Sequence, residues 1–201
     1  GASGVNSTIK TNSAGTSNLT LGVNAGNSIE SGGNYNVAIG DEAGTAITTG
    51  DYNTVIGFNS GDAITTGGEN TFLGYNSGGG NVSGNYNTFL GSGAGSATTG
   101  SDSTGVGRNA MTANTTGINV AVGYRALDAN TTGTSNVALG VDALGANVAG
   151  DQSVAVGHEA LLVQNPSGNV DMDNVAVGYR ALYANTTGTQ NNAIGSGALD
   201  A

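Results

Sequence analysis

The chain has 201 residues, of which 37 are glycine, one is proline and none is cysteine, and charged residues make up only 9%. So much glycine without proline excludes a collagen helix, and so little charge does not fit a disordered chain. Fourteen acidic and four basic residues give a net charge of −10, which argues against nucleic acid and against anionic membrane surfaces as partners, because both attract clustered Lys and Arg.

The N-terminal residues 1–17 are predicted to be a leader that ends in a partial repeat. Gly1-Ala2-Ser3 is interpreted as a cloning scar or an excision point. No basic and apolar targeting segment opens the chain, and no apolar run approaches the length of a membrane span. Without cysteine there is no disulfide framework. The repeat domain is therefore predicted over 18–201.

A motif of the form Asn-x-x-aliphatic-Gly recurs from residue 18 to the end of the chain. Its last residue, here called the repeat glycine, stands at Gly22, Gly40, Gly57, Gly74, Gly91, Gly107, Gly123, Gly140, Gly157, Gly178 and Gly195. The steps are 16 to 18 residues, except for one of 21 residues that marks an insertion at 161–173. A constant period of this length predicts a solenoid in which each unit is one short coil.

Each position of the repeat implies a constraint. The residue before the repeat glycine is always aliphatic, which we interpret as an inward-facing column. The residue four before it is Asn in nine copies, with Ser103 and Ser153 in the other two, and stacked Asn side chains predict a hydrogen-bonded ladder. The third residue after it is always Ala or Ser, which indicates a position crowded by another stretch of backbone.

A second turn signal, Thr-Thr-Gly, follows the repeat glycine in six copies, as at Thr48-Thr49-Gly50 and Thr131-Thr132-Gly133. Glycine there suits a corner with positive φ. The residues directly after the repeat glycine vary freely and include charges, which indicates a solvated turn. Each unit thus reads as a short strand, a glycine turn, a second short segment and a Thr-rich return.

The first five and the last six copies differ in two columns. Four residues after the repeat glycine, the first five copies have Gly, whereas the last six have Met111 or a leucine such as Leu127. Two residues before it, bulk such as Phe72 falls in the first part and Ala or Gly in the second, with Ala38 as the exception. We infer that the two columns share one interior volume, because cores conserve total volume.

The coils are predicted to need partners. Three or four sizeable apolar side chains per unit offer about 1.5–3 kcal/mol each, against an ordering cost of about 1.5 kcal/mol per residue. The strand carries apolar columns on opposite faces, so one face is expected to fill the coil and the other to bury against other copies. This predicts a homo-oligomer, with three-fold symmetry favoured for a fibre.

Segments such as Asn119-Val-Ala-Val-Gly-Tyr-Arg-Ala-Leu127 and its copy at 174–182 resemble the head repeats of trimeric autotransporter adhesins and related repeats of phage tail fibres. The resemblance spans about residues 18 to 199. It implies an all-β fold, a left-handed parallel β-roll (a left-handed β-solenoid) of about eleven 17-residue coils, intertwined as a homotrimer. It also implies an extracellular surface-binding or spacer segment. The unit with its Thr-Thr-Gly return is longer than the usual adhesin head unit, which favours the phage-fibre branch.

Two ligand sites are predicted. Tyr124 with Arg125, and Tyr179 with Arg180, occupy equivalent turns, where an exposed ring beside a cation could stack on a sugar of a cell-surface glycan. In the insertion, Asp171, Asp173 and Asn174 supply clustered oxygens suited to Ca²⁺. Without a ligand, the aromatic rings would simply shield neighbouring backbone, and the insertion would be a solvated loop.

No catalytic constellation stands out. His158 is the single histidine and lies in a variable turn, and the carboxylates are scattered over turns. Gly91-Ser-Gly93-Ala-Gly95 is similar to a phosphate-binding loop but belongs to the repeat and precedes no helix. The sequence therefore favours a non-enzymatic fibre segment that attaches to a host surface through a glycan or protein receptor. The alternatives are an ice-binding solenoid, suggested by the Thr-Thr-Gly column, and a polysaccharide-degrading fibre enzyme.

Overall fold

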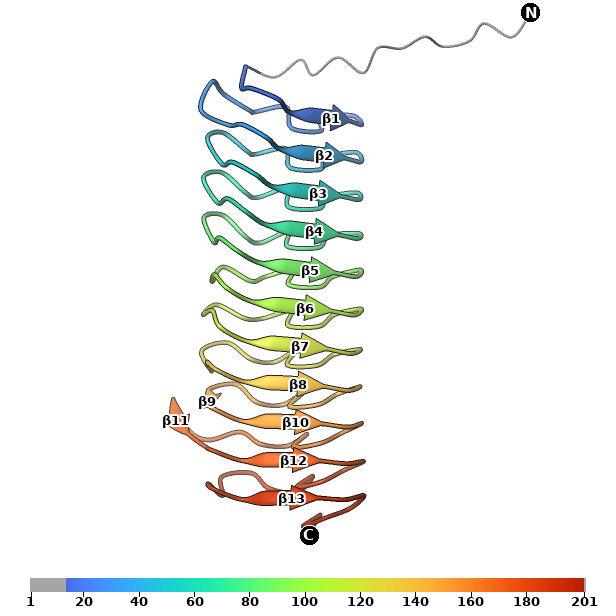
Figure 1. Ribbon diagram of the computed structural model, residues 1–201, viewed down its shortest axis with the longest axis vertical. Helices are drawn as coiled ribbons and strands as arrows, with labels where there is room; N and C mark the ends of the chain where they lie inside the picture. Colours follow the sequence, from blue (N-terminus) through green and yellow to red (C-terminus); the bar gives the residue numbers. More distant parts are fainter. Residues whose placement is uncertain (1–13, 201) are drawn as a thin grey trace, which may run out of the picture.

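The computed structural model describes residues 14–200, which form one long rod of short parallel strands (Figure 1). Every element in this range is a strand of two or three residues, and no helix occurs among them. The strands are β1 (Leu19–Leu21), β2 (Val37–Ile39), β3 (Thr54–Ile56), β4 (Thr71–Leu73), β5 (Thr88–Leu90), β6 (Thr104–Val106), β7 (Val120–Val122), β8 (Val137–Leu139), β9 (Gly150–Asp151), β10 (Val154–Val156), β11 (Val170–Asp171), β12 (Val175–Val177) and β13 (Asn192–Ile194).

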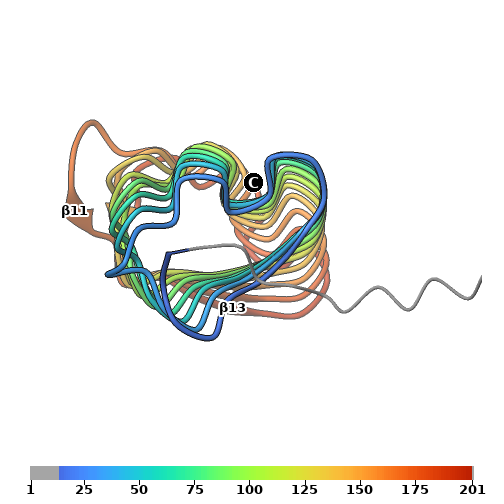
Figure 2. The ribbon, with the colours of Figure 1, turned by 90° about the horizontal axis from the view of Figure 1, so that it is seen from above.

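Eleven of these strands form one parallel sheet in sequence order, β1 to β8 followed by β10, β12 and β13. Equivalent residues of successive repeats are partners, as in Val55 with Phe72 and Phe72 with Phe89. Seen from above, successive coils superimpose around one interior (Figure 2). The chain is thus an all-β parallel solenoid of about ten turns, and this solenoid architecture is the one that the repeat predicts.

The inward position of each strand is its middle residue, not its last. Ala38, Val55, Phe72 and Phe89 are fully buried, whereas Leu73, directly before a repeat glycine, is 47% exposed. The interpretation of the aliphatic column before the repeat glycine as inward-facing is therefore wrong. Side chains alternate along a strand, so burying the middle residue turns its two neighbours outward.

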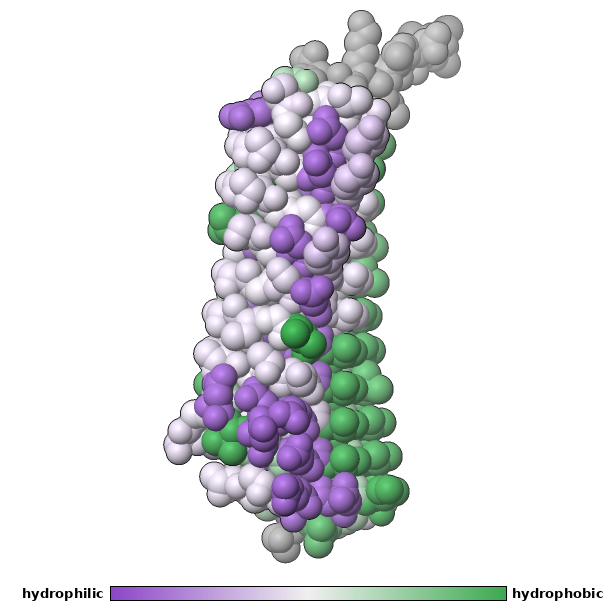
Figure 3. Space-filling view, turned by 60° about the vertical axis from the view of Figure 1, so that its left-hand side comes forward, coloured by the Kyte–Doolittle hydropathy of each residue, from purple (hydrophilic) through white to green (hydrophobic). Residues whose placement is uncertain are grey.

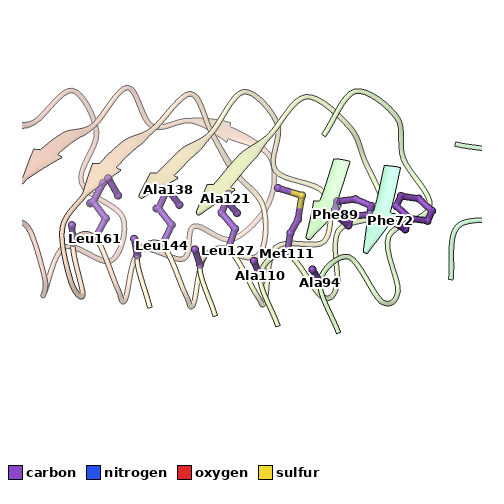
Figure 4. Close-up of a cluster of buried hydrophobic side chains, with 14 of the residues drawn as sticks. Phe72, Phe89, Ala94, Ala110, Met111, Ala121, Leu127, Ala138, Leu144 and Leu161 are labelled. Carbon is purple, nitrogen blue, oxygen red and sulfur yellow. The ribbon is translucent and has the colours of Figure 1, made fainter. Parts of the chain in front are cut away.

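The shared interior volume predicted for two columns is confirmed. A Cβ added at Gly78 would lie 2.3 Å from the Phe72 ring, and one at Gly95 would lie 2.4 Å from Phe89. From Met111 onward the interior is filled from the other wall, by leucines that lie opposite small strand residues such as Ala138 (Figure 4). Because a large side chain on one wall always faces a small residue on the other, the interior volume is constant and the backbone path stays the same.

A third interior column changes two repeats earlier, between the third and the fourth repeat. Seven residues after the repeat glycine stand Ile29, Ile47 and Ile64 in the first three repeats, and buried polar residues afterwards. These polar residues are Asn81, Thr98, Asn114, Asn130, Asn147 and Gln164, followed by the half-buried Asn185. The column is therefore aliphatic in the first three repeats and forms an internal row of polar side chains from the fourth repeat onward.

The predicted asparagine ladder is present along the rod. The Oδ1 atom of Asn36 accepts from the backbone N–H of Asn53 at 2.9 Å, and Oδ1 of Asn119 accepts from that of Asn136 at 2.9 Å. The Nδ2 group of Asn36 donates to the carbonyl of Gly50 at 2.8 Å. Each buried amide thus ties its own coil to the next and satisfies backbone groups at the corner.

The two corners of each coil need glycine for different reasons. The repeat glycines have φ between 128° and 144°, a region open only to glycine. The glycines of the Thr-Thr-Gly corners do not have positive φ, so the predicted reason for them is wrong. A Cβ at Gly50 would lie 2.3 Å from the carbonyl oxygen of Gly67, so these corners need glycine because the next coil passes so close.

The crowding predicted three residues after the repeat glycine is confirmed. Ala43, Ala94 and Ser77 at this position are fully buried. The Ser77 hydroxyl donates to the carbonyl of Phe89 in the next coil at 2.9 Å. This position therefore packs directly against the strand of the neighbouring coil.

The insertion packs against the rod through a small sheet and one buried side chain. Strands β9 and β11 pair in parallel, with Val170 beside Gly150, and the fully buried Met172 follows them. The Thr132 hydroxyl donates to Asn169 Oδ1 at 2.7 Å. The insertion is therefore an outward bulge of one coil, and the sheet continues past it without a break (Figure 2).

Candidate functional site

The outer face of the eleven-stranded sheet is the surface best suited to binding. It consists of the first and last residue of each strand, because the middle residue points inward. None of these positions carries a charged residue from β1 to β13. Leu73, Val122 and Ile194 are 47%, 39% and 78% exposed, and apolar atoms run along one edge of the rod in Figure 3. The last residue of each strand is leucine, isoleucine or valine throughout, and an exposed aliphatic column of this length marks an interaction surface.

The outer face has a polar interval that the sequence analysis did not single out. The first residue of four successive strands, β3 to β6, is threonine, and we call these residues the threonine seam: Thr54, Thr71, Thr88 and Thr104. Register pairing places each beside the next, Thr54 with Thr71 and Thr71 with Thr88. The signal was available in the repeat, three residues before the repeat glycine, where β2 and β7 to β12 have valine.

Stacked aromatic rings flank the outer face. The rings of Tyr35 and Tyr52 lie 5.0 Å apart with planes 6° from parallel, and those of Phe58 and Tyr75 lie 5.9 Å apart at 9°. Each pair joins neighbouring coils, so the rings cover one another's faces along the rod. About half or more of each of these side chains stays exposed, which leaves ring edges available to a partner.

The first predicted sugar site, Tyr124 and Arg125, is occupied by contacts within the chain. The Arg108 guanidinium lies 4.6 Å from the centre of the Tyr124 ring. The Nε atom of Arg125 donates to Asp128 at 2.7 Å and lies 3.7 Å from Asp142. The hydrogen bond and the charge of Asp128 raise the pKa of Arg125 above its ordinary value. An open depression of about 440 Å³ adjoins this cluster, but Arg125, the cation in its lining, is already paired with Asp128 and Asp142.

The second predicted pair, Tyr179 and Arg180, is more open. The Tyr179 side chain is 52% exposed and stacks on His158 at 5.6 Å. The Arg180 guanidinium lies over the ring of Tyr183 at 3.9 Å, and its Nε lies 3.4 Å from Glu159. Three sheet steps, roughly 14 Å, separate the turn after β7 from the turn after β12. The structure therefore does not bring the two predicted pairs into one site.

The three predicted calcium ligands are not equivalent. Asp171 and Asp173 are exposed, but Asn174 is fully buried in the asparagine ladder. Its Nδ2 donates to Gln164 and to the carbonyl of Gly188, and its Oδ1 accepts from the N–H of Asn191 at 2.9 Å. Asn174 is therefore wrong as a metal ligand. Within residues 14–200 no group of three or more acidic or histidine residues could hold a metal ion.

In five of the six Thr-Thr-Gly corners the hydroxyl of the first threonine donates to the backbone of the neighbouring coil. Thr48 Oγ1 donates to the carbonyl of Thr65 at 3.1 Å, and Thr115 Oγ1 donates to that of Thr131 at 2.7 Å. Such hydroxyls reinforce the contact between coils. This weakens the corner column as the basis for ice binding and shifts attention to the threonine seam.

Asp62, in the turn after β3, has a partly buried carboxyl group. Burial raises the pKa of Asp62, backbone hydrogen bonds partly offset this, and the negative charge of Glu42 adds to the rise. His158, the single histidine, lies 3.9 Å from Glu159 and is half exposed. These groups lie on separate turns, Asp62 after β3 and His158 after β10, and do not form one catalytic cluster.

No family model, no curated protein and no solved structure matches the chain. In the part of the chain that the structure describes, no helix is long and apolar enough to cross a bilayer. Function must therefore be inferred from the rod and its surfaces.

Proposed function

We propose that this chain is a structural and adhesive fibre segment, of a phage tail fibre or a bacterial surface adhesin, that attaches to a host surface. In this proposal three copies intertwine as left-handed β-rolls outside the cell, and the exposed turns meet a glycan or protein receptor. The chain acts by binding and has no enzymatic activity.

The outer face of the sheet carries the proposal. It is uncharged over all eleven strands, although the chain as a whole has a net charge of −10. Its exposed aliphatic side chains have no role in the interior of a single coil, which the middle strand residues and the facing wall already fill. Burying this face between copies would remove it from water and leave the turns outside, which is the arrangement that an adhesive fibre needs.

The mass of the protein in solution tests the proposal. Light scattering on a sizing column should give three times the chain mass of 19.4 kDa. A variant with Leu73→Lys and Leu139→Lys places two charges on the outer face and should give the single-chain mass, because buried charges are costly. The matched control, Val82→Lys, adds a charge at an exposed position away from the strands and should keep the trimer. A monodisperse monomer for the unaltered chain would contradict the proposal.

The threonine seam supports one second candidate, an ice-binding surface. It places threonine hydroxyls at a regular strand spacing of about 4.8 Å on a parallel sheet. This candidate requires the outer face to be open in solution, so it predicts a monomer with thermal hysteresis that Thr71→Leu reduces. A polysaccharide-degrading activity stays a prediction without a supporting cluster, and it is tested by turnover of a capsular or cell-wall polysaccharide.

A further inference from the structure

The outer face is not uniform along the rod, and four neighbouring strands form a polar interval within it. Its first-position residues are leucine or valine at β1 and β2, threonine from β3 to β6, valine at β7, β8, β10 and β12, and asparagine at the terminal strand β13. The last-position residues are leucine, isoleucine or valine throughout. A surface that only needed to be apolar would not segregate four threonines on neighbouring strands.

The size and periodicity of the outer face fit a second copy of the same chain. Ten steps of about 4.8 Å make it roughly 50 Å long, and with its flanking columns it offers roughly 600–900 Å². A standard interface takes about 800 Å² from each partner. The side chains repeat at the strand spacing, and another sheet with that spacing can pack against every rung. The absence of charge on the outer face lets two chains of net charge −10 meet there without repulsion at the contact.

We propose that copies of this chain pack by their outer faces in parallel and in register, and that the threonine seam sets this register. The inference rests on the proposed self-association and adds the surface, the orientation and the residues that select it.

The orientation follows from what each threonine would meet. In a parallel, in-register assembly Thr71 meets the Thr71 of the other copies, so hydroxyls donate to and accept from one another. In the antiparallel pair of full overlap, centred on β6, Thr54 would face Val154, Thr71 would face Val137 and Thr88 would face Val120. Those hydroxyls would be buried without partners, which is unfavourable. An antiparallel pair centred between β4 and β5 would match all four threonines but would leave the outer faces of β10, β12 and β13 of each copy uncovered. Parallel packing is also the only one of the two that three-fold symmetry allows.

The register follows from the ends of the seam. A shift by one strand leaves three threonine rungs matched and places one threonine of each copy against an aliphatic rung, Val37 or Val120. At the aliphatic rungs outside the seam, a one-strand shift exchanges one aliphatic residue for another. These rungs therefore distinguish little between one register and the next. Polar residues within apolar interfaces fix register in this way at some cost in stability.

Cross-linking tests the orientation cleanly because the chain has no cysteine. Leu21→Cys and Ile194→Cys place single thiols at opposite ends of the outer face, roughly 50 Å apart. With a short bis-maleimide, each variant alone should form covalent dimers between copies. A co-refolded mixture should give no product that joins a Leu21→Cys chain to an Ile194→Cys chain.

A second variant tests the role of the seam. Thr54→Val, Thr71→Val, Thr88→Val and Thr104→Val together remove all four hydroxyls and keep the β-branched shape. A background that mixes Leu21→Cys with Ile39→Cys reports the register through disulfide formation under mild oxidation, because a disulfide needs Cβ atoms within about 4.5 Å, less than one strand spacing. The unaltered seam should favour same-rung over offset disulfides by at least about tenfold, because an offset buries unpaired hydroxyls. The all-valine seam should reduce that preference to near unity while the mass stays unchanged. The control, Thr49→Val with Thr66→Val, alters exposed threonines outside the strands and should keep the preference.

The outcomes separate the inference from the proposed function. A single-chain mass removes both, and thermal hysteresis of that monomer would assign the outer face to ice. A trimer mass without cross-links at Leu21→Cys, or with cross-links only in the end-to-end mixture, overturns the inference alone. An unchanged rung preference in the all-valine variant overturns the role of the seam, and circular dichroism melting of each variant shows that it is folded.

Discussion

The first five and the last six repeats build the same coil from different cores. In the first section a bulky strand residue such as Phe72 reaches across to a glycine, Gly78, and in the first three repeats an isoleucine such as Ile64 fills the far corner. In the second section a leucine such as Leu144 reaches back to an alanine, and Asn147 occupies that corner. The backbone is therefore specified by the shared glycines and the asparagine ladder, and the core only has to supply a constant volume.

The second section tolerates strain that the first avoids. Leu127, Leu144 and Leu161 have φ of 51°, a left-handed conformation, where the first section has glycine at φ of 56° to 62°. That conformation costs about 1–2 kcal/mol for a residue with a side chain. Full burial of a leucine returns about 1.5–3 kcal/mol, so the exchange is close to neutral and either solution can be used.

The largest effect is expected from converting one section's core into the other's. Phe72→Ala should lower the free energy of unfolding by about 3–5 kcal/mol, because it opens a cavity. Gly78→Leu alone should also be strongly destabilising, since its Cβ meets the Phe72 ring at 2.3 Å. Together they should recover about 1–3 kcal/mol of the summed loss, as measured by chemical denaturation.

The reverse exchange in the second section is the matched control for this pair. Ala138→Phe with Leu144→Gly should also be better than the sum of its single changes. Strict additivity in both sections would contradict the shared interior volume.

A smaller loss, greater in the first section than in the second, is expected from breaking the asparagine ladder. Asn53→Ala leaves the carbonyl of Gly67 and the N–H of Asn70 without their partners. Asn136→Ala leaves the N–H of Ser153 without its partner, but the carbonyl of Gly150 still accepts from Asn147 Nδ2 at 2.9 Å. Asn53→Ala should therefore cost about 2–4 kcal/mol and Asn136→Ala about 1–3 kcal/mol, because each buried backbone group that is left unpaired is costly. Thermal melting of the two variants side by side checks this, and equal losses would contradict the support that Asn147 gives to the corner in the second section.

The start of the buried polar row offers a change of opposite sign. Asn81 is buried and its Oδ1 has no hydrogen-bond partner, because the preceding coil has Ile64 at that position. Asn81→Leu should stabilise the rod by about 1 kcal/mol, whereas Asn130→Leu should destabilise it by about 1–3 kcal/mol. Asn130 donates to Asn114 and Gly133 at 2.9 Å. Equal effects in denaturant titrations would contradict the assignment of Asn81 as the unsatisfied first member of the row.

The smallest effect concerns pH in the first section. Since burial raises the pKa of Asp62 above its ordinary 3.8, the folded chain binds this proton more tightly than the unfolded chain. The contribution of Asp62 to stability is therefore most favourable below pH 3.8 and is lost as pH rises through the raised folded pKa. Asp62→Asn should slightly raise the melting temperature at pH 7 and flatten its pH dependence near that window. Asp102→Asn, an exposed aspartate in the next part of the rod, is the control.

Much of the interior could be predicted because its columns vary together. The complementarity of Phe72 with Gly78, the ladder and the small residues three after the repeat glycine each leave a pattern that one constraint explains. The second buried row, from Asn114 to Asn147, was missed although its spacing of 16 and 17 residues matches the repeat. Its members alternate with the Thr-Thr-Gly signal, and Asn before Thr-Thr reads equally well as a turn residue.

The apolar pattern of a strand could not predict which of its residues point into the coil and which point outward. A three-residue strand such as Val-Ala-Val or Thr-Phe-Leu is apolar on both faces, and a shift of one residue exchanges inside for outside. Only the complementarity of its middle residue with the facing wall decides between the two. For the same reason the candidate ligands were placed on turns, where Tyr124 and Arg125 were visible, and the threonine seam on the outer face was not considered.

The bonds that join the coils also determine how the rod responds to force. The backbone contacts between successive coils, such as Thr54 N–H to the carbonyl of Asn70 at 2.8 Å and Gly57 N–H to that of Ile39 at 2.8 Å, point along the long axis. Tension between the two ends therefore pulls on one coil junction at a time, and a single chain would peel open from its end as a spring uncoils. Compression and bending load many junctions together. A rod of this kind resists compression but extends under tension. Neighbouring copies packed along its whole length would make it resist extension as well.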